Sequence, residues 1–305
     1  MVRLVIKLGI IGLKNKDNGH PFSFSAIING YNQKYFKKTN YNNILKYLRE
    51  KPRKSFGIKG VRVTHAWTQK KNLTKILCKS CNINHALKNY KEMLGKVNGV
   101  IIARDDLHYS ISKYFLKNKI PVFIDKPLTS KLNELNYFKK YLKNGLLMST
   151  SGLRYATEVS VLKKKMKKLG QIKFVNALVV NDFFKYGIHM LDIIDELNLL
   201  KVEKVIKLKS NIDQIIFYNK KKTTINLQCL GGVNKIFSLG LVGKKASAQI
   251  EIKDNFLAFK NTLKNFIKMI RTKKQVLNYK KTIKVINILI STNKLKNGKI
   301  QRFKK

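Results

Sequence analysis

Three side chains in this 305-residue sequence, Lys126, His189 and Asp192, are of types that could move a proton at a ligand. Lys126 directly follows residues 121–125, an apolar segment with the length of a buried parallel strand, and open α/β sheets bind ligands where such strands end. His189 and Asp192 are three positions apart, so a helix places them on one face. Because an imidazole titrates near neutral pH and an ammonium stabilises a developing alkoxide, the set predicts general acid/base chemistry. Taken singly, each residue also fits an ordinary structural role.

Glycines near the start of the chain predict a phosphate-binding loop. Gly9 and Gly12 lie in the first apolar segment, residues 4–12, and Leu13 and Lys14 follow. Glycines at the end of a first strand let the backbone approach a pyrophosphate, and the next helix offers free N–H groups and its positive dipole end. Lys14 stands where a G-x-G-x-x-G loop has its second glycine, so the fingerprint is degenerate.

This loop is also extended. Gly19-His20-Pro21 arrives late, just before a helix predicted over residues 22–29. We expect His20 to lie in a lengthened phosphate loop, and Ser23 to cap the helix.

The second predicted strand, residues 61–67, ends without the acidic residue that binds a ribose hydroxyl in many dinucleotide folds. Trp67 and Thr68 stand at its end, where the adenosine of a cofactor should lie. Gln69, Lys70 and Lys71 follow and suit a 2′-phosphate at least as well as a free 2′-hydroxyl. Both NAD and NADP remain open, and drift toward lysine explains the two lysines equally well.

The first half of the chain alternates short apolar segments with amphipathic ones, which is typical of a parallel α/β sheet. The predicted strands are residues 4–12, 61–67, 100–103, 121–125 and 146–150, and the predicted helices are residues 22–29, 73–81, 86–94, 110–117 and 131–143. Residues 31–57 form a polar insertion with a helix over 41–49, which either projects as a surface excursion or covers a ligand. We predict a Rossmann-like domain over residues 1–127, with 146–150 completing its sheet.

The second half, residues 128–305, predicts an α+β domain on a mainly antiparallel sheet. Its predicted strands are residues 172–180, 202–209, 214–218, 223–230, 236–242 and 246–252, and its predicted helices are residues 159–169, 186–197 and 257–270.

The composition is strongly basic, with 64 Lys and Arg against 16 Asp and Glu and a net charge of +48. Lysines are spread along the whole chain, and no arginine-rich arm, zinc-finger spacing or RNA-binding aromatic pattern is present. The charge therefore fits compositional drift better than a specific nucleic-acid partner, although such a surface will attract anionic ligands.

Three cysteines, an odd count, do not indicate a disulfide framework. Cys78 and Cys81 have the spacing of half a zinc motif, but no second ligand pair matches, so no metal site is expected. No apolar run approaches the length of a membrane span, which makes a cytoplasmic protein without membrane association the expected case.

The order of three motifs resembles the Gfo/Idh/MocA family, named for glucose–fructose oxidoreductase and inositol dehydrogenase. These motifs are Gly9-x-x-Gly12, Asp125-Lys126-Pro127 and Gly187-x-His189-x-x-Asp192. The resemblance implies an NAD(P)-dependent oxidoreductase of a carbohydrate-like alcohol or carbonyl, with a Rossmann domain and an open antiparallel sheet that often mediates oligomers. A homo-oligomer is therefore expected.

The resemblance also implies roles for single residues. Lys126 would hydrogen-bond the reacting oxygen, His189 would be the general acid/base, and Asp192 would orient the substrate. Further substrate contacts would come from Arg154 and Tyr155, and further cofactor contacts from Ala103, His108 and Asp125. Two alternatives remain: a non-catalytic ligand or polyanion binder with the same fold, and NAD-dependent glycoside hydrolysis.

Overall fold

The computed structural model describes residues 5–15, 18–220 and 222–303. It divides into two compact units, and the chain passes between them several times. The first unit takes the chain up to Thr129 together with Asn136–Ser149 and Phe259–Tyr279, and the second takes Ser130–Leu135, Thr150–Ala258 and the chain from Lys280. The division therefore does not fall at the single boundary near residue 127 that the sequence suggested.

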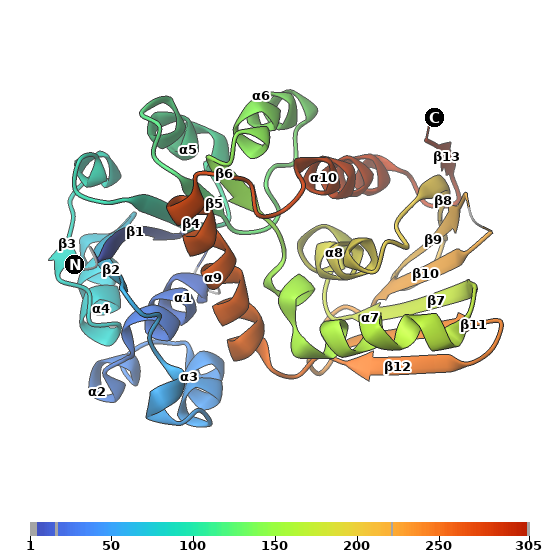
Figure 1. Cartoon of the computed structure of the whole chain (residues 1–305), viewed down its shortest axis with the longest axis horizontal. Coiled ribbons are helices and arrows are strands. Elements are labelled where there is room, and N and C mark those ends of the chain that lie inside the picture. Colours follow the sequence, from blue (N-terminus) through green and yellow to red (C-terminus); the bar gives the residue numbers. More distant parts are fainter. Residues whose placement is uncertain (1–4, 16–17, 221, 304–305) are drawn as a thin grey trace. The chain divides into compact units, whose positions relative to one another are not determined.

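The first unit is built on a six-stranded parallel sheet in the order β3-β2-β1-β4-β5-β6 (Figure 1). Its strands are β1 (Ile6–Leu13), β2 (Val61–Thr68), β3 (His85–Ala86), β4 (Gly99–Arg104), β5 (Val122–Ile124) and β6 (Leu147–Ser149). The predicted Rossmann-like sheet is confirmed, including the strand predicted over residues 146–150. The strand order reverses between β1 and β4, and sheets of this kind bind ligands in the crevice at that switch point.

Helices cover both faces of this sheet, with α1 (His20–Asn29) and α4 (Lys71–Ser80) on one side and α5 (His108–Lys117) and α6 (Leu132–Lys143) on the other (Figure 1). Burial on two faces explains why the central strands are continuously apolar: all six residues of β4 are buried.

The helix predicted over residues 86–94 is wrong. Those residues form the end of β3 and then a single 3₁₀ turn, Tyr90–Met93. Asn89 and Glu92 close a capping box on this turn, and Gly95 follows with a φ of 76°. A left-handed glycine so soon after a cap ends the helical turn before it can propagate.

The insertion forms two helices of the first unit, α2 (Gln33–Phe36) and α3 (Asn42–Arg49), and Tyr41 between them makes an aromatic contact with Phe22 of α1.

Cys78 in α4 and Cys81 just after it are buried free thiols, and burial raises the pKa of Cys78 to about 12. Among the described residues no cluster of side chains could hold a metal ion.

The second unit has a seven-stranded sheet in the order β12-β11-β7-β10-β9-β8-β13. Its strands are β7 (Ile172–Val179), β8 (Val202–Lys207), β9 (Asp213–Asn219), β10 (Thr224–Cys229), β11 (Phe237–Gly243), β12 (Ser247–Glu251) and β13 (Ile300–Arg302). Every neighbouring pair is antiparallel except β7 with β10. The predicted mainly antiparallel sheet is confirmed.

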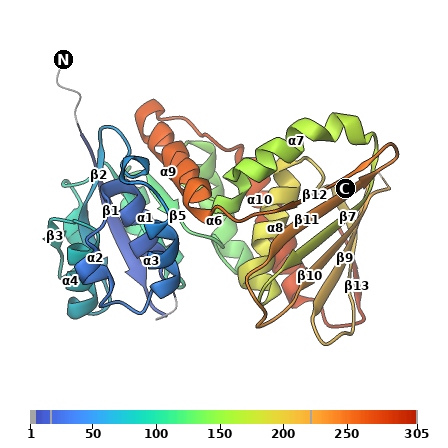
Figure 2. The ribbon, with the colours of Figure 1, turned by 90° about the horizontal axis from the view of Figure 1, so that it is seen from below.

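Helices α7 (Thr157–Leu169), α8 (Ile188–Glu196) and α10 (Tyr279–Lys294) lie along one face of that sheet, and none of the described helices lies on its other face (Figure 2). Neither α10 nor β13 was predicted from the sequence. Helix α9 (Asn255–Thr272) contributes most of its length to the first unit. Within the described chain, no helix is long and apolar enough to span a membrane.

Candidate active site

The phosphate loop begins at the carboxyl end of β1 with two residues in unusual backbone conformations. Leu13 has a φ of 71° and Lys14 a φ of 113°. Values in this range favour glycine, so Lys14 occupies both the sequence position and the backbone conformation of the missing second glycine. The Lys14 ammonium lies 3.6 Å from the Asp106 carboxylate. The backbone oxygen of Lys14 accepts a hydrogen bond from the Gln69 side chain.

Gly12 lets this loop close on the helix that follows. A Cβ at Gly12 would lie 2.5 Å from the ring of Pro21, which stands in the first turn of α1. The helix begins at His20 rather than near Phe22, so Ser23 is not its cap, and this expectation is wrong. Ser23 is instead buried inside the helix, where its hydroxyl bonds to that of Tyr47.

Gly9 lies in the middle of β1, away from the end of the strand. A Cβ there would lie 2.4 Å from the sulfur of Met93. Packing, rather than contact with a cofactor, accounts for this glycine.

The first residue of α1 is tied to the residue that follows β5. His20 Nδ1 lies 2.5 Å from Asp125 Oδ2, and Asp125 is buried. Burial alone would raise the pKa of Asp125, but His20, Lys126 and the Lys126 backbone N–H together hold that pKa below its ordinary value. The pair joins the phosphate loop to the segment that carries Lys126.

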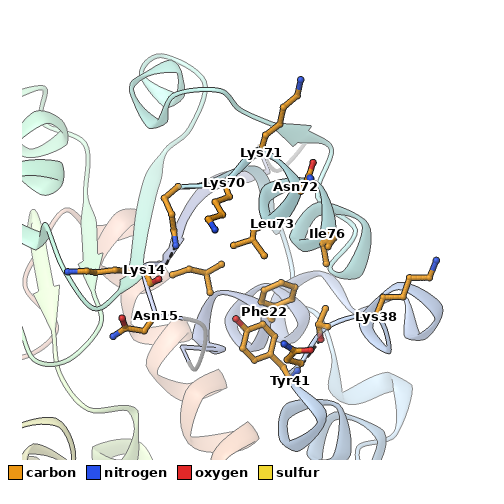
Figure 3. A pocket seen from close by; sticks show the side chains of 14 residues that line it. Lys14, Asn15, Phe22, Lys38, Tyr41, Lys70, Lys71, Asn72, Leu73 and Ile76 are labelled. Atoms are coloured by element: carbon orange, nitrogen blue, oxygen red, sulfur yellow. Dashed lines mark hydrogen bonds between the residues drawn. The ribbon is translucent and has the colours of Figure 1, made fainter.

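A pocket of about 420 Å³ opens beside the loop, at the carboxyl ends of β1 and β2 (Figure 3). Its lining comes from the loop, from the start of α4 and from the insertion: Leu13, Lys14, Asn15, Phe22, Lys38, Thr39, Asn40, Tyr41, Gln69, Lys70, Lys71, Asn72, Leu73 and Ile76. The insertion therefore forms one wall of a cavity.

The lysines of this pocket point in different directions. Figure 3 shows the ammonium of Lys70 over the apolar floor formed by Phe22 and Leu73, whereas Lys38 and Lys71 extend away from the cavity. None of the described lining residues is acidic. In the part of the chain that the structure describes, Lys70 has no ion-pair partner, so its charge is available to an anion.

The other predicted cofactor residues lie near this edge in different environments. Thr68 is buried and bonds to Thr74 and to the Lys70 backbone. The Trp67 indole donates to the Lys88 carbonyl, with the Arg104 guanidinium 5.6 Å from its ring. Ala103 is buried in β4 beside Gly12.

His108 begins α5, and its imidazole faces the protein rather than the crevice. Its two ring nitrogens lie 2.6 Å from the Arg104 carbonyl and 3.1 Å from the Leu128 carbonyl. Both ring nitrogens therefore face backbone carbonyls, and a ring N–H can donate only to one of these acceptors.

In the second unit, His189 lies in the first turn of α8, at the end of a π-helical turn, Phe183–Gly187. The ring is buried, with the rings of Tyr186 and Phe237 against it at 5.8 and 5.4 Å between centroids. Its Nδ1 lies 2.6 Å from Ser151 Oγ. A buried imidazole with one nitrogen bonded in this way has a fixed orientation.

Arg154 forms the centre of a buried ion-pair network beneath this histidine. Its side chain has no exposed surface, and its guanidinium reaches Asp192 at 2.5 Å, Asp195 at 3.0 Å and Glu196 at 3.1 Å. Burial opposes the charge, but Asp192 and Asp195 raise the pKa of Arg154 above its ordinary value. The structure thus brings Arg154 into direct contact with Asp192, and Ser151 bonds to both Asp192 and His189. The partners of Arg154 are protein carboxylates.

The remaining residues predicted from the sequence are placed as follows. Tyr155 ends the 3₁₀ turn that carries Arg154, and burial raises its pKa to about 12. Lys126 directly follows Asp125 after β5 in the first unit, and His189 belongs to the second. Sequence reasoning missed Ser151, Lys38 and Tyr41. For Ser151 a signal existed, because it comes just after a parallel strand, where ligand-binding residues concentrate.

A parallel sheet with a glycine-containing loop at its switch point, followed by a second unit on a mainly antiparallel sheet, defines a Rossmann-type fold. Residues 37–149 match the sequence model of the Gfo/Idh/MocA family, an oxidoreductase family with an NAD-binding Rossmann fold. The predicted resemblance to the Gfo/Idh/MocA family is thereby confirmed. No curated protein sequence matches this chain significantly.

Solved structures agree with the fold over nearly the whole chain. Myo-inositol 2-dehydrogenase from Lactobacillus plantarum matches with a TM-score of 0.77 and 15% identity, covering 98% of this chain and 100% of that one. Scyllo-inositol dehydrogenase from Lactobacillus casei, with bound NAD(H) and scyllo-inositol, matches with a TM-score of 0.77 and 12% identity, covering 98% and 99%. Myo-inositol dehydrogenase from Lactobacillus casei, in complex with NAD(H) and myo-inositol, gives 0.74 and 12%, covering 99% and 98%.

Proposed function

We propose that this protein is a nicotinamide-dependent dehydrogenase or reductase that interconverts an alcohol and a carbonyl on a sugar-like or polyol substrate. The observation that carries the proposal is the match, over 98% of the chain, to an inositol dehydrogenase with NAD(H) and inositol bound. The family match over residues 37–149 supports it independently.

The site residues divide this chemistry between them. A bound nicotinamide supplies the hydride chemistry. His189 takes or gives the proton of the reacting hydroxyl, and Lys126 stabilises negative charge on that oxygen. Tyr155 keeps its proposed role as a substrate contact.

We assign Arg154 and Asp192 to positioning rather than to substrate contact. Arg154 has no surface for a ligand, and three carboxylates already occupy its guanidinium. The Asp192 oxygens accept from Arg154, Thr150 and the Ser151 backbone. A substrate could reach either group only by breaking a buried ion pair, which is strongly unfavourable.

The proposed cofactor is NADP in preference to NAD. A free ribose hydroxyl is commonly bound by a carboxylate after β2, whereas a 2′-phosphate needs a cation there. This chain has Gln69 and Lys70 at that point, and the ammonium of Lys70 points into the pocket (Figure 3). Glycine-like backbone at Leu13 and Lys14 fits a pyrophosphate at the start of α1.

Titrations and assays test both the dehydrogenase function and the preference for NADP. Trp67 fluorescence would be followed with NADPH and NADH at ~0.3 M salt, where nonspecific attraction is screened. We expect Lys70→Glu to weaken NADPH binding by about tenfold or more while changing NADH binding little, because it removes the charge facing the 2′-phosphate. Lys71→Glu, the same charge change on a side chain that points away, is the matched control.

Turnover is then measured with a panel of inositols and sugars. His189→Gln should lower it by roughly 10²- to 10⁴-fold while cofactor binding persists. Binding of NADPH no tighter than that of ATP would contradict the dehydrogenase and favour a non-catalytic binder of anions. Equal effects of Lys70→Glu and Lys71→Glu would contradict only the preference for NADP.

A homo-oligomer through the uncovered face of the second sheet is also proposed. Phe174 and Val242 pair across β7 and β11 on that face and are 37% and 46% exposed. Adjacent exposed apolar side chains on an uncovered sheet favour association with a second copy. Light scattering measures the mass in solution, and a monomer at micromolar concentration would contradict this. The cytoplasmic location stays a prediction.

A further inference from the structure

A buried serine lies against the ring of His189. Ser151 Oγ is 2.6 Å from His189 Nδ1, and Ser151 is completely buried. We propose that Ser151 is a positioning residue that commits Nδ1 of His189, so that Nε2 is the nitrogen that exchanges a proton with the substrate. The inference rests on the proposed acid/base role of His189, whereas the contact can be tested separately.

Ser151 is itself held by neighbours besides His189. Its backbone N–H donates to Asp192 at 2.5 Å, and its Oγ accepts from the Leu153 N–H at 3.1 Å. Asp192 is fixed in turn by Arg154 at 2.5 Å. The buried ion pair therefore acts on the histidine through the serine, since its carboxylate bonds to the Ser151 backbone.

Two aromatic rings also restrain the ring of His189. Tyr186 and Phe237 meet it at interplanar angles of 61° and 84°, which are edge contacts. Aromatic contacts limit where the ring can lie but do not distinguish its two nitrogens. A hydrogen bond to Ser151 does distinguish them.

A hydroxyl suits a group that must change its protonation state. It can donate to a bare Nδ1 and accept from a protonated one, so the same contact survives when the ring gains or loses a proton. A carboxylate in this place would favour the charged ring alone. Ser151 thus fixes the orientation of His189 without committing it to one charge.

The same two side chains also suggest a serine nucleophile with its base, and the geometry argues against that function. Ser151 has no exposed surface, so no substrate carbon can reach its oxygen. In a catalytic triad the carboxylate orients the histidine, whereas Asp192 bonds to Arg154, Thr150 and the serine backbone.

The test is ¹⁵N NMR of the histidine side chains in the full-length protein above pH 8, where a neutral imidazole reports its tautomer. The chain has 5 histidines, and the His189 signals are those lost in His189→Gln. In the wild type we expect two clearly different nitrogen shifts, one protonated and one not. In Ser151→Ala the two shifts should move toward the averaged values of a free imidazole, and Ser151→Thr, which keeps a hydroxyl, should restore them.

Ser80→Ala is the matched control, because Ser80 is also completely buried and lies in α4 of the other unit. It should leave the His189 shifts unchanged. Averaged shifts in the wild type, or unchanged shifts in Ser151→Ala, would overturn the proposal. The wild-type outcome needs a variant only for its assignment through His189→Gln, so it holds even if Ser151→Ala fails to fold.

Turnover provides the functional half of the test. Ser151→Ala should lower kcat by about tenfold, the scale of one lost hydrogen bond, with KM for the cofactor unchanged. If the nitrogen shifts respond as expected while His189→Gln retains full activity, the positioning of His189 stands and its proposed catalytic function fails. If both substitutions lower kcat but the shifts do not respond, the positioning role is wrong.

Discussion

The pocket beside β1 and β2 and the network around Arg154 both use basic side chains, but in opposite environments. Lys14 is 58% exposed at its side chain, and Lys70 faces a cavity without a partner in the described structure. Arg154 has no exposed side-chain surface and is surrounded by three carboxylates. Exposed lysines attract an anion over a distance and tolerate replacement, whereas a buried guanidinium fixes geometry and tolerates none.

This difference has a consequence for the basic composition. Charge in excess can accumulate at the first region without cost to the fold, because solvent screens each lysine there. The second region depends on a balance of charges, which a further lysine would disturb. The chain therefore keeps its few carboxylates where they are needed: three of its 16 acidic residues surround Arg154.

The largest expected effect is that of Arg154→Met. Removing the guanidinium leaves the buried Asp192 without its cationic partner and Asp195 with Lys284 alone, so we expect the free energy of unfolding of the second unit to fall by about 3–5 kcal/mol. Urea unfolding monitored by circular dichroism measures this change. Lys163→Met, which removes an exposed partner of Glu196, should cost less than about 1 kcal/mol. Equal costs for the two variants would mean that the buried network does not determine stability.

Much of the fold could be predicted from the sequence, because parallel strands buried on two faces are recognisable as short apolar runs. This holds for β1, β2 and β4, whose residues are largely buried. The motifs at Lys126 and His189 could be found because each follows or begins an element with a clear pattern. The second sheet was recognised from its turns, although its one parallel pairing, β7 with β10, left no local signal.

The parts that were not predicted depend on contacts between distant residues. Ser151 and His189 are 38 positions apart, and nothing in the local pattern around Ser151 indicates that an imidazole packs on it. Tyr41 likewise reaches the phosphate loop only because the insertion folds back, where a Cβ on Gly19 would lie 2.8 Å from its ring. For Arg154 the sequence suggested a substrate contact, since burial of a long charged side chain has no local signature.

An intermediate effect is expected for Lys14→Gly in the phosphate loop. A lysine with a φ of 113° is strained, and glycine adopts this backbone freely, so we expect the free energy of unfolding of the first unit to rise by about 1 kcal/mol. Lys14→Ala keeps the strain while removing the same charge, and serves as the control. Thermal unfolding of the three proteins separates backbone strain from charge: a gain shared by the alanine variant would assign it to the lost ammonium.

The smallest expected effect concerns the pair of His20 and Asp125. A carboxyl whose pKa is lower in the folded protein stabilises the fold above its unfolded pKa of about 4, and this contribution is lost as the pH falls through the folded pKa. Since Asp125 is buried, removing the imidazole in His20→Gln should raise its pKa, and acid unfolding should then begin at a higher pH.

The measurement for this pair is the midpoint of acid-induced unfolding in ~0.15 M salt. His85→Gln, at an exposed ring that stacks on His65, is the control and should leave the midpoint unchanged. His20 and Asp125 lie in the same unit as the phosphate loop, where solvent screens the lysines, yet their contact is largely buried. The variant therefore tests whether this region also contains a charge contact that the fold needs. If His20→Gln unfolds at the wild-type pH, this contact is as replaceable as the surrounding lysines, and only the network around Arg154 uses buried charge to fix geometry.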